Sequence, residues 1–137
     1  MGSINIDGSL VLDSRMDSIN QIEKLIDSQS QMLNIDDEVY GKYMLAVVES
    51  VNNAIVHGNK MSSEKKVYVH YHIADERIEV SVRDEGDGFD PDALPDPTAE
   101  DNIMKDCGRG IFLMRHLADD LTFENHGRMV KLVFNLQ

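Results

Sequence analysis

Several features that define common classes of protein are scarce in this 137-residue sequence. The single cysteine, Cys107, excludes an internal disulfide and a zinc site built from cysteines. No apolar run is long enough to span a bilayer, and the opening MGSINIDGSL lacks the charged and apolar regions of a signal peptide. These absences predict a soluble, cytoplasmic protein that does not act in a membrane.

Positive charge is also scarce. The chain has 13 lysines and arginines against 25 aspartates and glutamates, which gives a formal net charge of -12. Such a charge repels a phosphodiester backbone, and no stripe of basic residues offsets it, so direct nucleic-acid binding is not expected. The length suffices for one domain with a core and is too short for two, so residues 1–137 are expected to form a single domain.

Apolar residues at helical spacing predict two long helices. The first is expected to follow Asp13 and Ser14, either of which could cap it, and to end near residue 33. The second should run from about residue 36 to about residue 57 and stop at Gly58. A shorter amphipathic helix is expected over residues 110–117.

Apolar and polar residues that alternate with period two predict the strands. VYVHYHI and RIEVSVR form a hairpin across the turn ADER, and a closing hairpin is expected about His126-Gly127. Residues 4–12 predict an edge strand, or a hairpin about Asp7-Gly8. Together with the helices, these strands predict one compact α+β unit.

The stretch VRDEGDGFDP gathers four carboxylates around two glycines, on Asp84, Glu85, Asp87 and Asp90. Such density suggests a cation. If Asp84 held the first position of an EF-hand loop, Gly86 and Gly88 would fall where side-chain oxygens are needed. A stacked calcium repeat would need many copies, and the chain has one. The loop therefore does not match a calcium site.

The stretch AVVESVNNAIVHGNK contains an unusual polar stripe. Glu49, Asn53 and His57 are four residues apart and share one face of the second helix, among alanines, valines and isoleucines. Such a stripe either faces solvent or needs partners, and the apolar surroundings favour the second interpretation. His57, near the helix end, can also simply interact with the helix dipole and the last carbonyls.

The stretch CGRGIFLMRHL places Gly108 and Gly110 before the expected short helix. Glycines there let backbone N–H groups converge on a phosphate at a helix N-terminus. Alone the pattern is weak, since it can equally mark a flexible start of a helix. It is neither a P-loop nor a dinucleotide fingerprint.

The order of these three motifs is more specific than any one of them. It resembles the nucleotide-binding domain of the GHKL superfamily of ATPases, and within it the small, stand-alone anti-sigma factor serine kinases. Glu49, four residues before Asn53, matches the serine kinases in particular. The resemblance implies a Bergerat fold, a two-layer α/β sandwich in which helices cover one face of a mixed, mainly antiparallel sheet.

The resemblance also implies a role for the acidic loop. Asp84 would accept a hydrogen bond from the exocyclic amine of adenine, and Gly86 and Gly88 would leave room for the base beside the backbone. Glu85, Asp87 and Asp90 would then be solvated charges.

By the same resemblance, Asn53 would be a ligand of Mg²⁺ that accompanies ATP. Glu49 would be the catalytic base that accepts the proton of an attacking serine or threonine hydroxyl. Gly108, Arg109 and Gly110 match the phosphate loop.

Two further expectations concern the loop before this helix and the closing hairpin. Residues 90–107, with three prolines, would form a mobile lid over ATP. The closing hairpin has Gly127-Arg128 where the family usually has Gly-Thr, so the threonine's contact to adenine is lost, rebuilt by water, or replaced by a stacked guanidinium.

The resemblance implies a kinase that phosphorylates an anti-sigma factor antagonist protein and otherwise sequesters a sigma factor, with a homodimer as the expected state. The alternative is a nucleotide-gated binding module that holds its partner without phosphorylating it. Glu49 favours the kinase, since nucleotide binding alone needs no base at that position.

Overall fold

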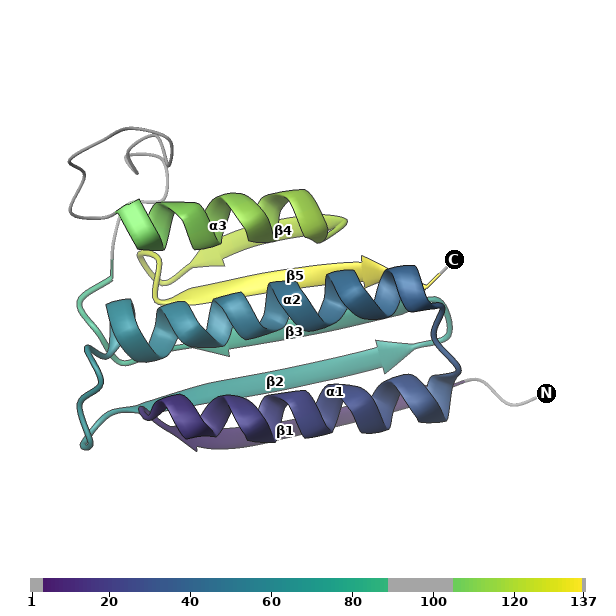
Figure 1. Ribbon diagram of the computed structural model, residues 1–137, viewed down its shortest axis with the longest axis horizontal. Coiled ribbons are helices and arrows are strands. Elements are labelled where there is room, and N and C mark those ends of the chain that lie inside the picture. Colours follow the sequence, from purple (N-terminus) through teal and green to yellow (C-terminus); the bar gives the residue numbers. More distant parts are fainter. Residues whose placement is uncertain (1–3, 89–104, 137) are drawn as a thin grey trace.

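The computed structural model describes residues 4–88 and 105–136. Its helices and strands occur along the chain as β1 (Asn5–Asp13), α1 (Ile19–Leu33), α2 (Asp37–Asn53), β2 (Lys66–Ala74), β3 (Arg77–Arg83), α3 (Lys105–Leu117), β4 (Asp120–Glu124) and β5 (Met129–Asn135). Figure 1 shows that the three helices cover one face of the sheet. The expected α+β sandwich of two layers is therefore confirmed.

The sheet has five strands in the order β1-β2-β3-β5-β4. Every neighbouring pair is antiparallel, where the resemblance implied a mixed, mainly antiparallel sheet. The register aligns one row of apolar residues across all five strands, namely Leu10, Val69, Val82, Val130 and Phe123. This row lies on the face that the helices cover, and its last three members reach the site described below.

The core forms where alternate strand residues meet the inner faces of α1 and α2. Ile22, Ile26, Val51 and Phe134 are among its fully buried side chains. Burying each such side chain contributes about 1.5–3 kcal/mol, which outweighs the weak intrinsic preferences of single residues. The observed elements confirm the two predicted hairpins, β2–β3 and β4–β5, and both long helices, α1 and α2.

The edge strand expected for the N-terminal segment is confirmed, and the hairpin alternative is not. Residues 5–13 form one continuous edge strand, and Asp7 and Gly8 lie within it rather than in a turn. Gly8 lies against Tyr71, and a Cβ there would come within 2.3 Å of the Tyr71 hydroxyl oxygen. Glycine is thus needed for packing against the neighbouring strand.

Neither Asp13 nor Ser14 caps α1. A short 3-10 turn, Met16–Ser18, precedes the helix, and no side-chain hydrogen bond caps either element. The Ser14 hydroxyl donates to the Lys65 carbonyl oxygen at 2.6 Å, which ties the end of β1 to the start of β2. The serine therefore joins strands instead of starting a helix.

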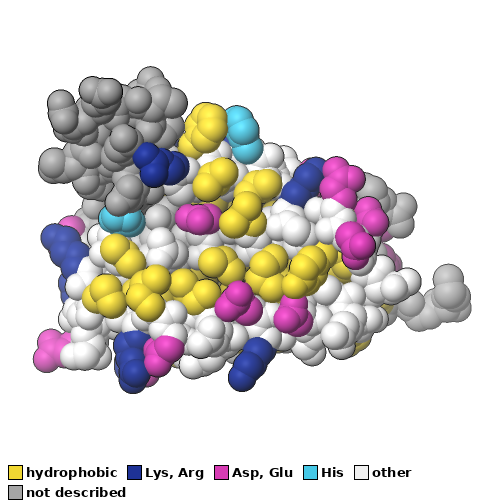
Figure 2. Space-filling model, in the orientation of Figure 1, with side chains coloured by type: hydrophobic (Ala, Val, Ile, Leu, Met, Phe, Trp, Pro, Cys, Tyr) yellow, Lys and Arg dark blue, Asp and Glu magenta, His cyan; other side chains and the backbone are white. Residues whose placement is uncertain are grey.

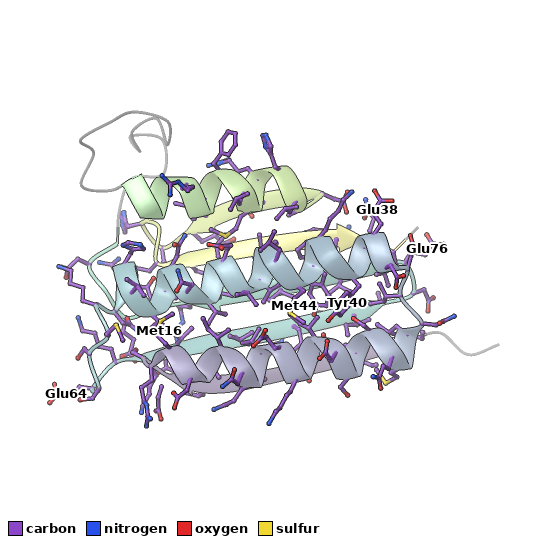
Figure 3. The ribbon with its side chains drawn as sticks, viewed as in Figure 1. Met16, Glu38, Tyr40, Met44, Glu64 and Glu76 are labelled. Carbon is purple, nitrogen blue, oxygen red and sulfur yellow. The ribbon has the colours of Figure 1, made fainter. Side chains whose placement is uncertain are left out.

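The outer surface of the helical layer carries an apolar band where α1 and α2 meet (Figure 2). Tyr40 and Met44 project from α2 toward α1 in Figure 3. The Tyr40 hydroxyl donates to the Asp27 carboxylate at 2.5 Å, so this contact joins the two helices at their exposed edge. Among the described residues, no helix has the length and hydropathy that a membrane span requires.

Candidate functional site

A cavity of about 260 Å³ opens between the end of α2, the loop after β3, α3 and the turn that joins β4 to β5. Part of its apolar lining comes from the sheet row, through Val82, Val130 and Phe123, and Ile111 and Met114 of α3 add to it. Its polar lining includes Asn53, Asp84 and Arg128. Three motifs that are distant in the sequence thus meet at one place.

Asp84 stands at the exit of β3, and only 8% of its surface is exposed. Its carboxylate Oδ1 accepts a hydrogen bond from the Gly86 N–H at 2.8 Å, and its own N–H donates to the Arg128 carbonyl oxygen at 2.9 Å. Burial raises the pKa of the Asp84 carboxyl above its usual value, while the Gly86 N–H and the Arg128 charge oppose this shift. A carboxylate can accept several hydrogen bonds, so Asp84 retains capacity for a donor in the cavity.

Glycines make the packing around Asp84 possible. A Cβ at Gly58 would lie 2.4 Å from the Asp84 carboxyl carbon, and a Cβ at Gly86 would lie 2.0 Å from the Gly58 carbonyl oxygen. Gly88 has a positive φ of +80°, and a Cβ there would meet the His126 carbonyl oxygen at 2.3 Å. The protein's own backbone therefore already requires glycine at these positions, in addition to any room that a ligand needs.

Asn59 anchors this loop from beneath, a role that was not predicted from the sequence. Its side chain is fully buried, and its Nδ2 donates to the Ser14 hydroxyl and the Lys66 carbonyl oxygen, both at 2.9 Å. Its Oδ1 accepts from the Glu85 N–H at 2.7 Å. A polar residue just after a helix end usually faces solvent, so only the tertiary structure identifies this anchor.

The polar stripe of α2 supplies Asn53 to the cavity. Among residues 4–88 and 105–136, neither amide atom of Asn53 has a hydrogen-bond partner, although both are buried. An unpaired buried polar group costs about 1–3 kcal/mol, so the amide is suited to a ligand. Glu49 lies one helical turn earlier and is partly exposed, but it does not line the cavity.

Helix α3 begins at Lys105, so the expectation that Gly108 and Gly110 precede it was wrong. Both glycines are buried within the helix and neither has a positive φ, whereas Arg109 is exposed. A Cβ at Gly110 would lie 3.0 Å from each amide atom of Asn53. The glycine thus lets α3 pass close to α2, and this close approach explains a residue that otherwise weakens a helix.

The remaining candidate residues lie in different parts of the structure. His57 is partly buried in the π-helical turn Ala54–Gly58 that extends α2, and it lines the cavity. Glu85 accepts hydrogen bonds from the Lys66 N–H at 2.8 Å and from the Tyr68 hydroxyl at 3.2 Å.

Within the described ranges, no three His, Cys, Asp or Glu side chains are grouped to hold a metal ion. Asp90 and the rest of residues 90–104 of the expected lid lie outside the described residues. Residues 105–107, also expected in the lid, instead start α3.

The cavity thus contains a carboxylate and an unpaired amide, and a helix with two glycines lies beside it. Comparison with known proteins identifies a family for this chain. Residues 13–134 match the family described as histidine kinase-like ATPase domain. The chain belongs to this family.

Particular relatives are similar over about half of their length. The serine-protein kinase RsbW of Bacillus subtilis is 32% identical over 88 residues, which cover 60% of this chain and 55% of the relative. The serine-protein kinase RsbW of Listeria innocua is 34% identical over 83 residues, covering 56% of this chain and 53% of the relative. The solved RsbU and RsbW domains of Rv1364c from Mycobacterium tuberculosis share the fold, with a TM-score of 0.65 at 14% identity, over 96% of this chain and 32% of that one.

Proposed function

We propose that this protein is an ATP-dependent protein serine/threonine kinase that phosphorylates an anti-sigma factor antagonist and, when free of it, sequesters a sigma factor. The observation that carries the proposal is the meeting of Asp84 and the unpaired Asn53 amide in one cavity. The match to an ATPase domain family and the similarity to serine-protein kinases support it.

The base of the nucleotide is proposed to bind at the Asp84 end of the cavity. The buried carboxylate accepts a hydrogen bond from the exocyclic amine of adenine, whereas guanine places a carbonyl oxygen at that position. The apolar row of Val82, Val130 and Phe123 provides a surface for the flat base. Asp84 is therefore the proposed source of selectivity for ATP.

The phosphates are proposed to bind between Asn53 and the start of α3. The Asn53 amide oxygen is the kind of neutral oxygen ligand that Mg²⁺ accepts, and its lack of a partner among the described residues fits this use. When bound, Mg²⁺ would neutralise charge on the phosphates. Gly108, Arg109 and Gly110 are proposed to contact the phosphates from α3, where Gly110 lies close to the Asn53 amide, although none of the three is among the residues that line the cavity.

Glu49 is proposed as the general base. It precedes Asn53 by four residues on the same helix face, which places the two side chains about 6 Å apart along the axis. From there its carboxylate accepts the proton of a serine or threonine hydroxyl as that oxygen attacks the γ-phosphate. Its partial exposure outside the cavity lining leaves it accessible to the hydroxyl of a protein substrate.

A phosphotransfer assay tests this proposal. The protein is incubated with γ-labelled ATP, Mg²⁺ and candidate antagonist proteins from the same genome, with and without a chelator. We expect label on a serine or threonine of one candidate, and none when Mg²⁺ is removed. Protein that binds Mg-ATP and the antagonist without labelling it would instead be a nucleotide-gated binding module.

A further inference from the structure

The side chain of Arg128 joins two segments at the Asp84 end of the cavity. Its Nε donates to the Gly86 carbonyl oxygen at 2.8 Å, and its Nη2 donates to the Asp87 carbonyl oxygen at 3.0 Å. Its Nη1 donates to the Asn125 carbonyl oxygen at 3.2 Å. All three guanidinium nitrogens thus bind backbone, on the loop after β3 and on the β4–β5 turn.

The turn that presents Arg128 has an unusual backbone. Asn125, His126 and Gly127 all have positive φ, of 53°, 56° and 81°. The Arg128 N–H closes the turn on the Asn125 carbonyl oxygen at 3.1 Å. Non-glycine residues in this region are unfavourable and persist only where the surroundings hold them. The contact of His126 with Gly88 and the guanidinium bonds provide such surroundings.

Both the backbone and the carboxylate of Asp84 are connected to Arg128. The Arg128 carbonyl oxygen accepts the Asp84 N–H at 2.9 Å. Gly86, whose carbonyl oxygen is held by the Arg128 guanidinium, donates its N–H to the Asp84 carboxylate at 2.8 Å. A shift of the guanidinium would therefore move Gly86, the residue whose N–H orients the carboxylate.

We propose that Arg128 is a positioning residue that fixes the Asp84 carboxylate toward the purine amine and so sets the preference for adenine over guanine nucleotides. This inference rests on the proposed function. Arg128 replaces the direct contact of the family's usual threonine by an indirect one, through the loop of residues 84–88. A mobile Asp84 would lose its hydrogen bond to adenine and would also repel the carbonyl oxygen of guanine less strongly.

The test compares ADP with GDP, since these nucleotides report on base recognition without phosphotransfer. Dissociation constants are measured by calorimetry for the parent, Arg128→Ala, Arg128→Lys and the control Lys131→Ala. Lys131 is a cation on β5, the strand that follows Arg128, exposed and outside this cavity, with Glu124 3.9 Å away. Arg128→Lys keeps the charge, but one ammonium group cannot reproduce three donors in a planar fork.

For the parent we expect ADP to bind at least about tenfold more tightly than GDP, as one charge-assisted hydrogen bond allows. Both Arg128 variants should lose about tenfold or more in ADP affinity and little in GDP affinity, so that the preference largely disappears. The control Lys131→Ala should keep the preference for ADP over GDP. A purely structural role for Arg128 would weaken both nucleotides equally and leave their ratio unchanged.

The outcomes separate the two proposals. A parent without any preference for ADP would contradict the proposed function at its base-recognition step. A parent with the preference, together with Arg128 variants that retain it, would overturn the role of Arg128 alone. Thermal unfolding without nucleotide shows which variants are folded at the titration temperature, and if Arg128→Ala does not fold, the ratio for Arg128→Lys decides.

Discussion

The two ends of the cavity differ in how completely the protein satisfies its own polar groups. At the Asp84 end, hydrogen bonds donated by Gly86 and Arg128, and one that Asn59 accepts from Glu85, hold the loop in place. At the Asn53 end, a buried amide has no partner among residues 4–88 and 105–136. Under the proposed function, the protein builds its base pocket in advance, whereas ligand atoms would complete the phosphate end.

The polar groups at both ends of the cavity lower the stability of the folded protein. An unpaired buried amide costs about 1–3 kcal/mol, and burial of the Asp84 carboxylate disfavours its charged form. Both residues are therefore expected to serve binding at the expense of stability, as functional sites often do. The predictions below test whether variants of these residues bind nucleotide less tightly while their stability is unchanged or increased.

The largest effect is expected from Glu49→Gln, one helical turn before Asn53 on α2. The substitution keeps the size of the side chain but removes its basicity, so transfer of phosphate to the antagonist should slow by about a hundredfold or more. Binding of Mg-ATP should stay close to that of the parent. Rates from labelled ATP, together with calorimetry, measure both quantities, and full transfer by the variant would exclude Glu49 as the base.

Asp84→Asn tests the base end. ATP binding should weaken by more than about tenfold, or at least about 1.4 kcal/mol, because an amide is a poorer acceptor and presents a donor as well. Calorimetry of both proteins with Mg-ATP measures the change. An unaltered dissociation constant would show that Asp84 does not contact the base.

The same variant should be at least as stable as the parent at neutral pH. Because the folded-state pKa of Asp84 is raised, the folded protein binds more protons than the unfolded chain between the two pKa values. The contribution of Asp84 to the free energy of unfolding therefore falls as pH rises through that window, which begins near the usual value of 3.8. Thermal unfolding of parent and variant at acidic and at neutral pH measures this pH dependence. A variant that is less stable than the parent only at neutral pH would contradict the expected direction.

Asn53→Ala tests the phosphate end without touching the base. Affinity for Mg-ATP should fall by about tenfold, while metal-free ADP should be affected less, since the lost oxygen is a proposed metal ligand. The variant should not lose stability, because it removes an unpaired amide. Asn52→Ala, at the neighbouring position of the same helix, is the matched control, and equal Mg-ATP affinity for both variants would contradict the proposed ligand.

The smallest effect is expected from Gly110→Ala. The added Cβ would lie 3.0 Å from the Asn53 amide, so α3 or Asn53 must shift by a few tenths of an ångström. Alanine also favours the helix by about 1 kcal/mol, which offsets part of the strain. We expect little change in the unfolding temperature and a severalfold loss of Mg-ATP affinity. A tighter complex would mean that Gly110 does not limit the space at Asn53.

Much of this site could be predicted because its motifs end regular elements. Asn53 lies on a strongly patterned helix and Asp84 follows a strand of clear alternation, and the structure brings both to one cavity. Their chemical roles remain predictions. The order of the motifs carried more information than their individual patterns, since each alone has an ordinary structural explanation.

The errors arose at glycines and in long-range contacts. Gly8 and Gly110 suggested a turn and a flexible start of a helix, but each allows close packing against a side chain distant in sequence, Tyr71 and Asn53. The anchoring by Asn59 and the bonds of Arg128 also join segments that are far apart along the chain. Local sequence patterns do not encode such contacts, because they depend on which strands and turns become neighbours.

The most direct test of the account is a calorimetric titration of the unmodified protein with Mg-ATP and, separately, with Mg-GTP. Since Asp84 is proposed to accept a hydrogen bond from the adenine amine and would face a carbonyl oxygen in guanine, we predict one site that binds ATP at least about tenfold more tightly than GTP. Equal affinities for the two nucleotides, or no binding of either, would contradict the claim that this cavity is an adenine-nucleotide site.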